Sequence, residues 1–265
     1  MSSKKMKFDK VTIVTGGSKG IGEGCARVFC QAGAKVVICA RGKEAGKATA
    51  KVLNQKGPGS CLFIQCDVSI PDQIQELINQ TVKQFGRIDC LINNAGWHPP
   101  FVPIDEFSIA DFNGLLQTNL VSVFAACKFA LPHLRKTRGS IINVSSLVGI
   151  VGDGGACTYV ATKAGIIGLT QSLAIDEAKY NVRVNAICPA SVGTQLTYNH
   201  IERSENPKEM RKILERWHWL NRLATIEEIG QACLFLASDQ ASFITGVALP
   251  VSGGAELGYG QKATG

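Results

Sequence analysis

The sequence has no run of 18 or more predominantly apolar residues, and its first ten residues, Met1 to Lys10, are polar and lysine-rich. Without such a run, the sequence predicts no membrane-spanning helix. The N-terminus also lacks the apolar core of a secretory signal and the arginine- and serine-rich character of a transit peptide. We therefore expect a cytoplasmic protein that does not span a membrane.

Cysteine spacing typical of disulfide-rich or zinc-binding proteins is also missing. No two of the ten cysteines stand in a C-x-x-C arrangement, and the four histidines share no ligand spacing with them. Most cysteines lie in apolar runs such as Val36 to Cys39, so we expect buried, reduced thiols and no metal site. A stripe of lysine and arginine with interleaved aromatic residues is absent too, which argues against nucleic-acid binding. The net charge of +7 therefore indicates a solvated basic surface, and it would also suit an anionic cofactor.

The 265 residues, 45% hydrophobic and 18% charged, are enough for one large α/β domain spanning 1–265. Short apolar, β-branched segments that predict strands alternate with helical patterns, and they lie at residues 11–15, 35–39, 62–66, 88–92, 141–145, 182–187 and 246–251. This alternation predicts a doubly wound parallel sheet, a Rossmann fold of about seven strands, with ligands gathered at the carboxyl ends of the strands. Thr15, Asp67, Asn93 and Ser146 all lie at or just after such ends.

A glycine-rich turn follows the first predicted strand and opens a helical pattern. Glycines let the backbone approach a pyrophosphate, and the free N–H groups at the start of a helix meet its negative charge. The turn has the pattern T-G-x-x-x-G-x-G. Its predicted cofactor contacts are Gly16, Ser18, Lys19, Gly20, Ile21 and Gly22.

The second predicted strand ends in Ala40-Arg41 and carries no carboxylate there. Dinucleotide folds that use NAD have an acidic residue about 20 positions after the glycines, which binds the ribose hydroxyls. Arg41 and Lys19 could instead hold a 2′-phosphate, which favours NADP(H) and leaves NAD(H) as the alternative. Arg41 could also be a solvated turn residue or stack on the adenine of either cofactor.

Tyr159 and Lys163 stand four residues apart on a predicted helix and therefore share one face. A phenol has a pKa of about 10, and a nearby ammonium lowers that pKa. Ser146, thirteen residues upstream of Tyr159, could hold a substrate oxygen at the same point. These residues would move a proton on or off an alcohol or ketone, although such a tyrosine–lysine pair taken alone predicts only a surface contact.

Two further polar residues lie near this predicted edge of the sheet. His98, in the segment Trp97 to Pro100, is a candidate substrate contact, although a histidine in a proline-rich loop is commonly just half-exposed. Asn119 stands among apolar residues in a helical stretch from Ile109 to Lys136, so it needs a buried partner. That partner is either the backbone or a water near Lys163.

Residues 190–222 break the alternation of strands and helices and mix polar with aromatic side chains. A segment of this length is typical of a lid or binding loop that sets substrate identity. The glycine-rich tail from Gly253 to Gly260 is either a frayed end or a segment that packs on a neighbouring subunit.

Together these residues resemble the classical short-chain dehydrogenase/reductase family, over about residues 10 to 260. The likeness depends on four motifs that occur in order, which are Thr15-Gly16-x-x-x-Gly20-Ile21-Gly22, Asn93-Asn94-Ala95-Gly96, Ser146 and Tyr159-x-x-x-Lys163. The resemblance implies an NAD(P)-dependent oxidoreductase acting on a secondary alcohol or ketone. It also implies a homo-oligomer, a tetramer.

The resemblance implies a role for each matched residue. Tyr159 is the expected general acid/base, with its pKa lowered by Lys163 and the nicotinamide, and Lys163 also holds the nicotinamide ribose. Ser146 orients the substrate oxygen, and Asn119 anchors a water of the proton relay. On the cofactor, Asp67 meets the adenine, Asn93 the adenosine ribose, and Val192 and Thr194 the carboxamide. The remaining predicted cofactor contacts are Val68, Ala95, Gly96 and Pro189.

A narrower resemblance, to the type 14 17β-hydroxysteroid dehydrogenases, depends on Gly96 to Pro100, Ser145 to Gly149 and the tail from Gly253. It implies action at the 17-position of a steroid. A sugar dehydrogenase, for fucose for example, or a small-alcohol dehydrogenase is the alternative on the same site, and a catalytically silent nucleotide-binding scaffold is the alternative of another class. Pro189-Ala190 departs from the family's Pro-Gly, and Ala40 stands where that type carries an acidic residue.

Overall fold

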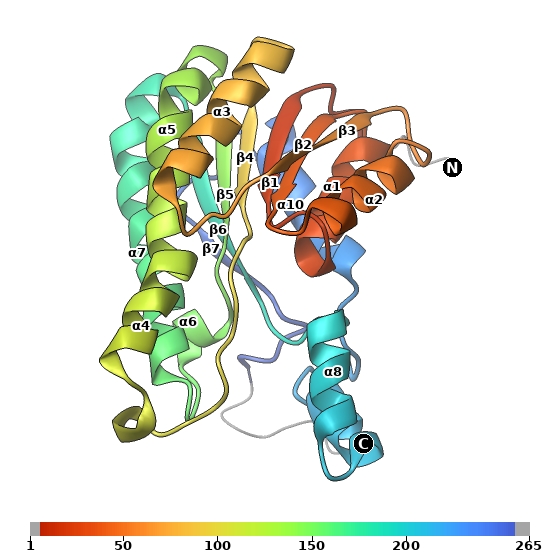
Figure 1. The fold of residues 1–265 in the computed structure, drawn as a ribbon, viewed down its shortest axis with the longest axis vertical. Coiled ribbons are helices and arrows are strands. Elements are labelled where there is room, and N and C mark those ends of the chain that lie inside the picture. The colour runs from red at the N-terminus through yellow and green to blue at the C-terminus, as the bar shows by residue number, and fades with distance from the viewer. Residues whose placement is uncertain (1–5, 258–265) are drawn as a thin grey trace.

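A computed structural model describes residues 6–257, and residues 1–5 and 258–265 lie outside the described part. A single parallel sheet of seven strands in the order β3-β2-β1-β4-β5-β6-β7 forms its centre (Figure 1). The strand order reverses direction between β1 and β4, which is where a doubly wound fold places its ligand. The predicted seven-stranded Rossmann fold is therefore confirmed.

The strands form where apolar, β-branched runs were found, because a parallel sheet covered on both faces needs apolar side chains on both. Their bounds are β1 Val11–Thr15, β2 Lys35–Ala40, β3 Ser60–Gln65, β4 Cys90–Asn93, β5 Ser140–Val144, β6 Arg183–Pro189 and β7 Ala248–Val251. Every side chain of β1, β4 and β5 is buried. All neighbouring strands are parallel, so their carboxyl ends lie on one side of the sheet, the side on which the helices labelled α4, α6 and α8 stand at the bottom of Figure 1.

Two layers of helices cover the sheet. One face carries α1 Gly20–Gln31, α2 Lys43–Leu53 and α10 Ile226–Ala237, which share an apolar cluster with the sheet. The other face carries α3 Pro71–Phe85, α5 Ser122–Thr137 and α7 Cys157–Glu177 over a second cluster (Figure 1). α1 and α10 approach closely, because a Cβ on Gly24 would lie 2.3 Å from the carbonyl oxygen of Ile226. The remaining helices, α4 Ile109–Leu116, α6 Val148–Val151, α8 Gln195–Arg203 and α9 Pro207–Arg216, extend beyond the carboxyl ends of the strands.

The predicted long helix is continuous but contains one π turn. α4 leads into the π turn Gln117–Val121 and then into α5, so that the helix runs from Ile109 to Thr137. By length and composition it is the one helix among residues 6–257 that could cross a membrane, but half of its most apolar window is buried. It packs between α3 and α7, as a core helix does. The cytoplasmic location stays a prediction.

Among the ten cysteines, all of them free, only Cys157 is exposed. The others lie in the two apolar clusters or in the strands, as expected for small hydrophobic residues. Within residues 6–257 no group of three or more histidine, cysteine, aspartate or glutamate side chains is arranged to bind a metal ion.

The predicted lid contains two helices that the sequence interpretation did not assign. Thr194 caps α8 by accepting a hydrogen bond from the N–H of Thr197, and Asn206 caps α9 in the same way from Glu209. Pro207 occupies the first turn of α9, a position that favours helix initiation. Residues 190–222 are thus a helical hairpin, placed beside the carboxyl ends of β6 and β7 (Figure 1).

Candidate active site

Tyr159, Lys163 and Ser146 come together just beyond the carboxyl end of β5. α7 places Tyr159 and Lys163 one turn apart, and the Lys163 Nζ lies 5.6 Å from the centre of the Tyr159 ring. The Ser146 side chain lies close enough to the Tyr159 hydroxyl to lower its pKa by hydrogen bonding. Lys163 is 5% exposed, and its ammonium donates to the carbonyl oxygen of Val144 at 2.9 Å. The three predicted catalytic side chains therefore lie next to one another.

Burial dominates the protonation of this group. It raises the pKa of Tyr159 to about 12, against a smaller lowering by the hydrogen bond with Ser146. Burial also lowers the pKa of Lys163 to about 8. The expected acidification of the phenol by its neighbouring lysine is thus not present in the protein chain alone. A further positive charge at this point, such as an oxidised nicotinamide would bring, would lower the phenol's pKa.

Asn119 is fully buried within the π turn, and its side-chain amide is committed to the backbone. It donates to the carbonyl oxygen of Trp97 at 2.9 Å and accepts from the N–H of the same residue at 3.0 Å. A Cβ on Gly96 would lie 3.1 Å from the Asn119 Oδ1 and 3.8 Å from the Lys163 Nζ. Asn119 therefore fixes the strand-to-loop segment that passes beside Lys163, which is the backbone partner that the sequence left as one of two options.

His98 lies directly against the predicted catalytic tyrosine. Its ring centre is 4.2 Å from that of Tyr159 and 4.8 Å from that of Phe101. Burial lowers the pKa of His98, and the charges of Asp153 and His200 also act on it. The ring is half-buried, as the plain interpretation of the sequence had it, but its place beside Tyr159 agrees with a substrate contact.

The glycine turn forms a cradle that side chains would fill. Gly16 has a φ of +65°, which only glycine adopts without strain, and a Cβ on Gly22 would lie 2.4 Å from the carbonyl oxygen of Gly16. Lys19 stands at the N-cap of α1, and no side chain caps the helix there. The first N–H groups of α1 are thus available to an anion at the positive end of the helix. The cradle fits the pyrophosphate of a dinucleotide.

Close contacts connect this cradle to the rest of the predicted site. A Cβ on Gly20 would lie 3.6 Å from the Thr194 side chain, and one on Gly16 would lie 3.0 Å from the Ala95 Cα. The structure therefore brings together the predicted residues from four segments of the chain, which are the turn after β1, the loop after β4, the loop after β5 with α7, and the loop after β6. Pro189, the last residue of β6, accepts a hydrogen bond from the N–H of Leu147, and Val192 pairs with Ala224.

Arg41 and Asp67 stand at the far end of this edge, after β2 and β3. They line a surface pocket of about 480 Å³. The pKa of Asp67 is lowered mainly by hydrogen bonds from Ser69, with a smaller contribution from the charge of Arg41. Val68, beside Asp67, is buried. This end of the site has the acceptor and the cation that the sequence predicts for the adenosine half of the cofactor.

The two adjacent asparagines of the loop after β4 have different roles. The Asn93 side chain is buried and donates to the Asn143 Oδ1 at 2.9 Å, so it points into the core and can reach a cofactor only through its backbone. Asn94, which was not among the predicted site residues, donates to the backbone carbonyl oxygens of Thr15 and Gly16. Asn94 therefore holds the glycine turn in place. Strand alternation was the signal that would have distinguished the two.

The parallel sheet, the glycine cradle and the serine–tyrosine–lysine group define a nicotinamide-dependent oxidoreductase. The profile of the family described as enoyl-(acyl carrier protein) reductase matches residues 16–256. The chain belongs to the short-chain dehydrogenase/reductase family, whose members of this kind act on alcohol groups and use NAD(P). The prediction of the family from the sequence is confirmed, and the chain is an enzyme of the oxidoreductase class.

Similar proteins cover almost the whole chain. L-fucose dehydrogenase of Bos taurus is 44% identical over 254 residues, which are 96% of this chain and 92% of that protein. Meso-2,3-butanediol dehydrogenase of Serratia marcescens is 39% identical, over 97% of this chain and 98% of that protein. Among solved structures, Cj0485 dehydrogenase matches with a TM-score of 0.89 at 35% identity, covering 99% of this chain and 100% of that one.

Proposed function

We propose that this enzyme oxidises a secondary hydroxyl group of a sugar of the L-fucose kind, with a nicotinamide dinucleotide as hydride acceptor. The observation that carries the proposal is the 44% identity over 96% of the chain to an enzyme named L-fucose dehydrogenase. The polar surroundings of the tyrosine agree with it, since His98 packs against Tyr159 and the charges of Asp153 and His200 act on His98. Such groups suit a substrate with several hydroxyls. The steroid prediction is not supported by the comparisons.

The residues of the site have distinct roles in this reaction. The bound dinucleotide supplies the hydride chemistry. Tyr159 accepts the proton of the substrate hydroxyl, while Ser146, whose side chain acts on the same phenol, orients the substrate oxygen. Lys163 brings a positive charge to the buried phenol and holds the nicotinamide ribose. Asn119 fixes the backbone beside Lys163, and the glycine cradle binds the pyrophosphate.

A substrate panel tests the proposal. We expect kcat/KM for L-fucose to exceed that for meso-2,3-butanediol and for a 17β-hydroxysteroid by at least about tenfold, since a site with polar partners discriminates strongly against substrates that leave them unpaired. Preference for the steroid would restore the prediction made from the sequence, which the exposed aromatic side chains Tyr198, Trp217 and Trp219 of the lid favour. Absence of turnover with every alcohol and ketone, with cofactor still bound, would favour the silent scaffold.

For the cofactor we propose NADP(H), with Arg41 binding the 2′-phosphate and Lys19 close by. The support is that the residue before Arg41 is Ala40, so no carboxylate ends β2 to repel a phosphate, and that Arg41 lines the pocket beside Asp67. We expect Arg41→Asp to shift the NADPH-to-NADH preference about tenfold or more towards NADH, because a charge-assisted contact is lost and a repulsion gained. Lys51→Asp, the same charge change on exposed α2, is the control and should not shift it. An unchanged preference in Arg41→Asp would favour NAD(H).

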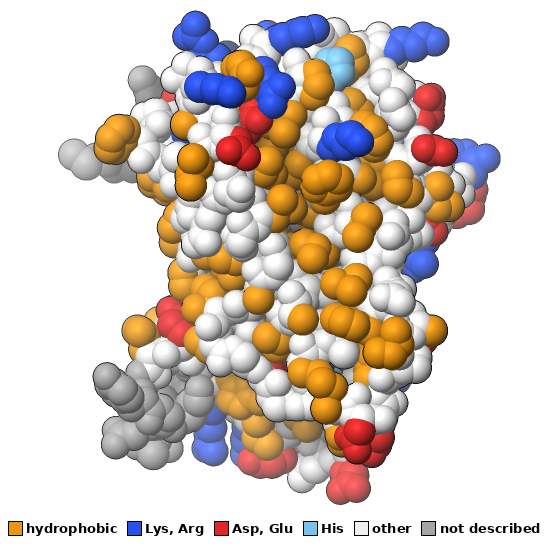
Figure 2. Space-filling view, turned by 90° about the vertical axis from the view of Figure 1, so that its left-hand side faces the viewer, with side chains coloured by type: hydrophobic (Ala, Val, Ile, Leu, Met, Phe, Trp, Pro, Cys, Tyr) orange, Lys and Arg blue, Asp and Glu red, His pale blue; other side chains and the backbone are white. Residues whose placement is uncertain are grey.

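We also propose that the enzyme is a homo-oligomer, a tetramer as the family resemblance implied. The face that carries α5 and α7 supports this, because apolar side chains are spread over it (Figure 2). Val121, Phe124 and Ile175 are exposed there, Ile175 by 78%. Exposed apolar area of this kind is typical of a subunit contact. Light scattering on the purified protein tests it, and Phe124→Glu should lower the measured mass if this face is the contact.

A further inference from the structure

His218 lies where three segments of the chain meet. It follows α9 at the end of the lid, and its side chain is buried, with 2% exposed. The loop after β6, which contains Ser191, packs on one side of it. On another side is the C-terminal segment, since a Cβ on Gly253 would lie 3.3 Å from the His218 Cβ. The sequence pattern around this histidine indicates no role for it beyond its place in the lid.

Both ring nitrogens of His218 are hydrogen-bonded to the backbone. Nδ1 lies 2.9 Å from the carbonyl oxygen of Leu214, in α9, and Nε2 lies 3.2 Å from the N of Ser191. A carbonyl oxygen only accepts and an N–H only donates, so Nδ1 carries the proton and Nε2 is the acceptor. The ring therefore joins the last turn of α9 to residues 191–194, at the start of the lid, by two hydrogen bonds of opposite direction.

Ser191 belongs to the loop that is expected to bind the nicotinamide carboxamide. It directly precedes Val192, and Thr194 follows two residues later. Part of this loop is held by backbone contacts with Ala224, which donates to the carbonyl oxygen of Ser191 and accepts from the N–H of Gly193. Two side chains from beyond the loop also hold it: Thr197 in α8 donates to the carbonyl oxygen of Val192 at 2.7 Å, and His218 after α9 accepts from the N–H of Ser191.

We propose that His218 is a positioning residue for the cofactor: its Nε2 fixes the loop 191–194 in the conformation that receives the nicotinamide. His218 is itself held by the carbonyl oxygen of Leu214 and by its contact with Gly253. The conformation of the loop therefore depends on the packing of α9 and of the C-terminal segment against each other. Without the acceptor, the loop has to be ordered again each time cofactor binds, which weakens binding. The inference rests on the proposed role of Val192 and Thr194 in cofactor binding.

Three variants separate the two hydrogen bonds. In His218→Gln the amide oxygen stands one atom further out than in asparagine and can replace Nε2 as the acceptor for Ser191. In His218→Asn the amide reaches only the position of Nδ1, so it can donate to the carbonyl oxygen of Leu214 but leaves Ser191 unpaired. His218→Leu removes both hydrogen bonds, the one to Leu214 and the one from Ser191. The readout is the dissociation constant of NADPH and of NADH without substrate, from the fluorescence of the bound cofactor.

We expect His218→Asn and His218→Leu to weaken cofactor binding about tenfold, since each leaves the partly buried N–H of Ser191 without its acceptor and the loop less ordered before binding. His218→Gln should stay within about threefold of the unchanged protein. Hydrogen exchange of the cofactor-free protein should become faster at residues 190–194 in the first two variants. Equal cofactor binding in all three variants would overturn the proposal, as would an equal loss in all three, because that would mark a merely structural side chain.

Measurements on the unchanged protein keep the test decisive if a variant does not fold, and they separate this inference from the proposed function. In the unchanged protein without cofactor, the amide of Ser191 should exchange slowly, and rapid exchange there would overturn the proposal without any substitution. If the unchanged protein binds neither NADPH nor NADH, the proposed function fails and takes this inference with it. Cofactor binding that is normal in the unchanged protein and in His218→Asn overturns the inference alone.

Discussion

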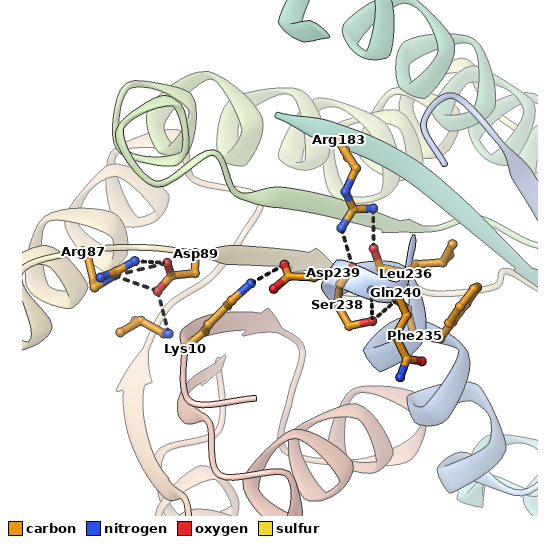
Figure 3. A network of polar contacts seen from close by, with 10 residues as sticks. Lys10, Arg87, Asp89, Arg183, Phe235, Leu236, Ser238, Asp239 and Gln240 are labelled. Carbon is orange, nitrogen blue, oxygen red and sulfur yellow. Dashed lines mark hydrogen bonds and ion pairs between the residues drawn. The ribbon is translucent and has the colours of Figure 1, made fainter. Parts of the chain in front are cut away.

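Charged side chains are buried both at the amino ends of the strands, called here the amino edge, and at their carboxyl ends, the carboxyl edge. The two edges differ in the partners that these charges have. At the amino edge, before β4, Asp89 is buried and pairs with Arg87, and it also accepts from the N–H of Val11 at 2.9 Å (Figure 3). Arg183, at the start of β6, donates to the carbonyl oxygens of Leu236 and Ser238. Each of these charges has partners of opposite polarity, which is the usual condition for burying a charge.

At the carboxyl edge the buried charge is Lys163, and the ion pairs of residues 6–257 do not include it. Its one hydrogen bond is to the carbonyl oxygen of Val144, and burial lowers its pKa to about 8. Tyr159 beside it has a pKa raised to about 12. The charges at the amino edge therefore stabilise the fold, whereas the buried charge at the carboxyl edge has no partner of opposite charge within residues 6–257. Perturbed protonation of this kind is typical of an active site.

Removing the phenol hydroxyl should have the largest effect. We expect Tyr159→Phe to lower kcat about a thousandfold or more, since general acid/base groups contribute about 10²–10⁴ in rate. The dissociation constant of the cofactor and the unfolding midpoint in urea should hardly change. Tyr180→Phe, the same substitution beyond the end of α7, is the control. Turnover within about tenfold of the unchanged enzyme would contradict the role of Tyr159.

Lys163→Met should abolish most activity while stabilising the chain without cofactor. The pKa of Lys163 falls from 10.5 to about 8 on folding, so at pH 7 the protonated lysine costs the folded state about 3 kcal/mol. The lost hydrogen bond to Val144 offsets about 1 kcal/mol of that gain. Urea unfolding at pH 7 should therefore show a net gain of about 2 kcal/mol.

The pH dependence of Lys163→Met gives the sign of this effect. Between pH 8 and 10.5 the unfolded lysine holds a proton that the folded one has lost, so the stability of the unchanged chain rises with pH there. The stability that the chain gains when Lys163 is neutral is fully present above pH 10.5, and it is lost as the pH falls through the folded-state pKa of about 8. Lys163→Met should lack this rise. A variant that is less stable at pH 7, with the slope retained, would mean that the lysine is paired like the charges at the other edge.

At the amino edge the opposite pattern is expected. Asp89→Ala leaves the N–H of Val11 without its acceptor and Arg87 without its partner, and should lower the free energy of unfolding by about 2 kcal/mol. Arg87 is half-exposed, which keeps the loss below that of a fully buried pair. The kcat of the folded fraction should not change. Asp9→Ala, on an exposed neighbour, is the control, and an equal loss of stability there would contradict the special place of Asp89.

The strands and the cofactor turn could be predicted because each is a local signal. An apolar run followed by glycines defines β1 and the cradle without any knowledge of the rest of the chain. Strand ends were less accurate. β4 begins at Cys90 rather than at residue 88, because Asp89 is used outside the strand to hold Val11 and Arg87. That use depends on segments far apart in sequence.

Parts of the site that depend on long-range contacts could not be predicted. The lid helix α9 does have a local signal, because Asn206-Pro207 with Glu209 is an N-cap pattern. The aromatic residues around it favoured the interpretation of the segment as a loop. The π turn around Asn119 has no such signal. The link from His218 to Ser191 joins residues 27 positions apart, which a loop interpretation does not place together. The raised pKa of Tyr159 likewise follows from burial, which sequence spacing does not give.

The smallest effect is expected from the exposed ion pair of the amino edge. Lys10 lies 3.0 Å from Asp239, whose side chain is 93% exposed (Figure 3). Exposed pairs of this kind contribute about 0–1 kcal/mol, because water screens the charges and two mobile side chains have to be ordered. Lys10→Met should therefore lower the free energy of unfolding by less than about 1 kcal/mol in urea. A loss as large as that of Asp89→Ala would show instead that Lys10, Asp89 and Arg183 act as one network, so that the amino edge stabilises the fold through coupled charges rather than through separate pairs.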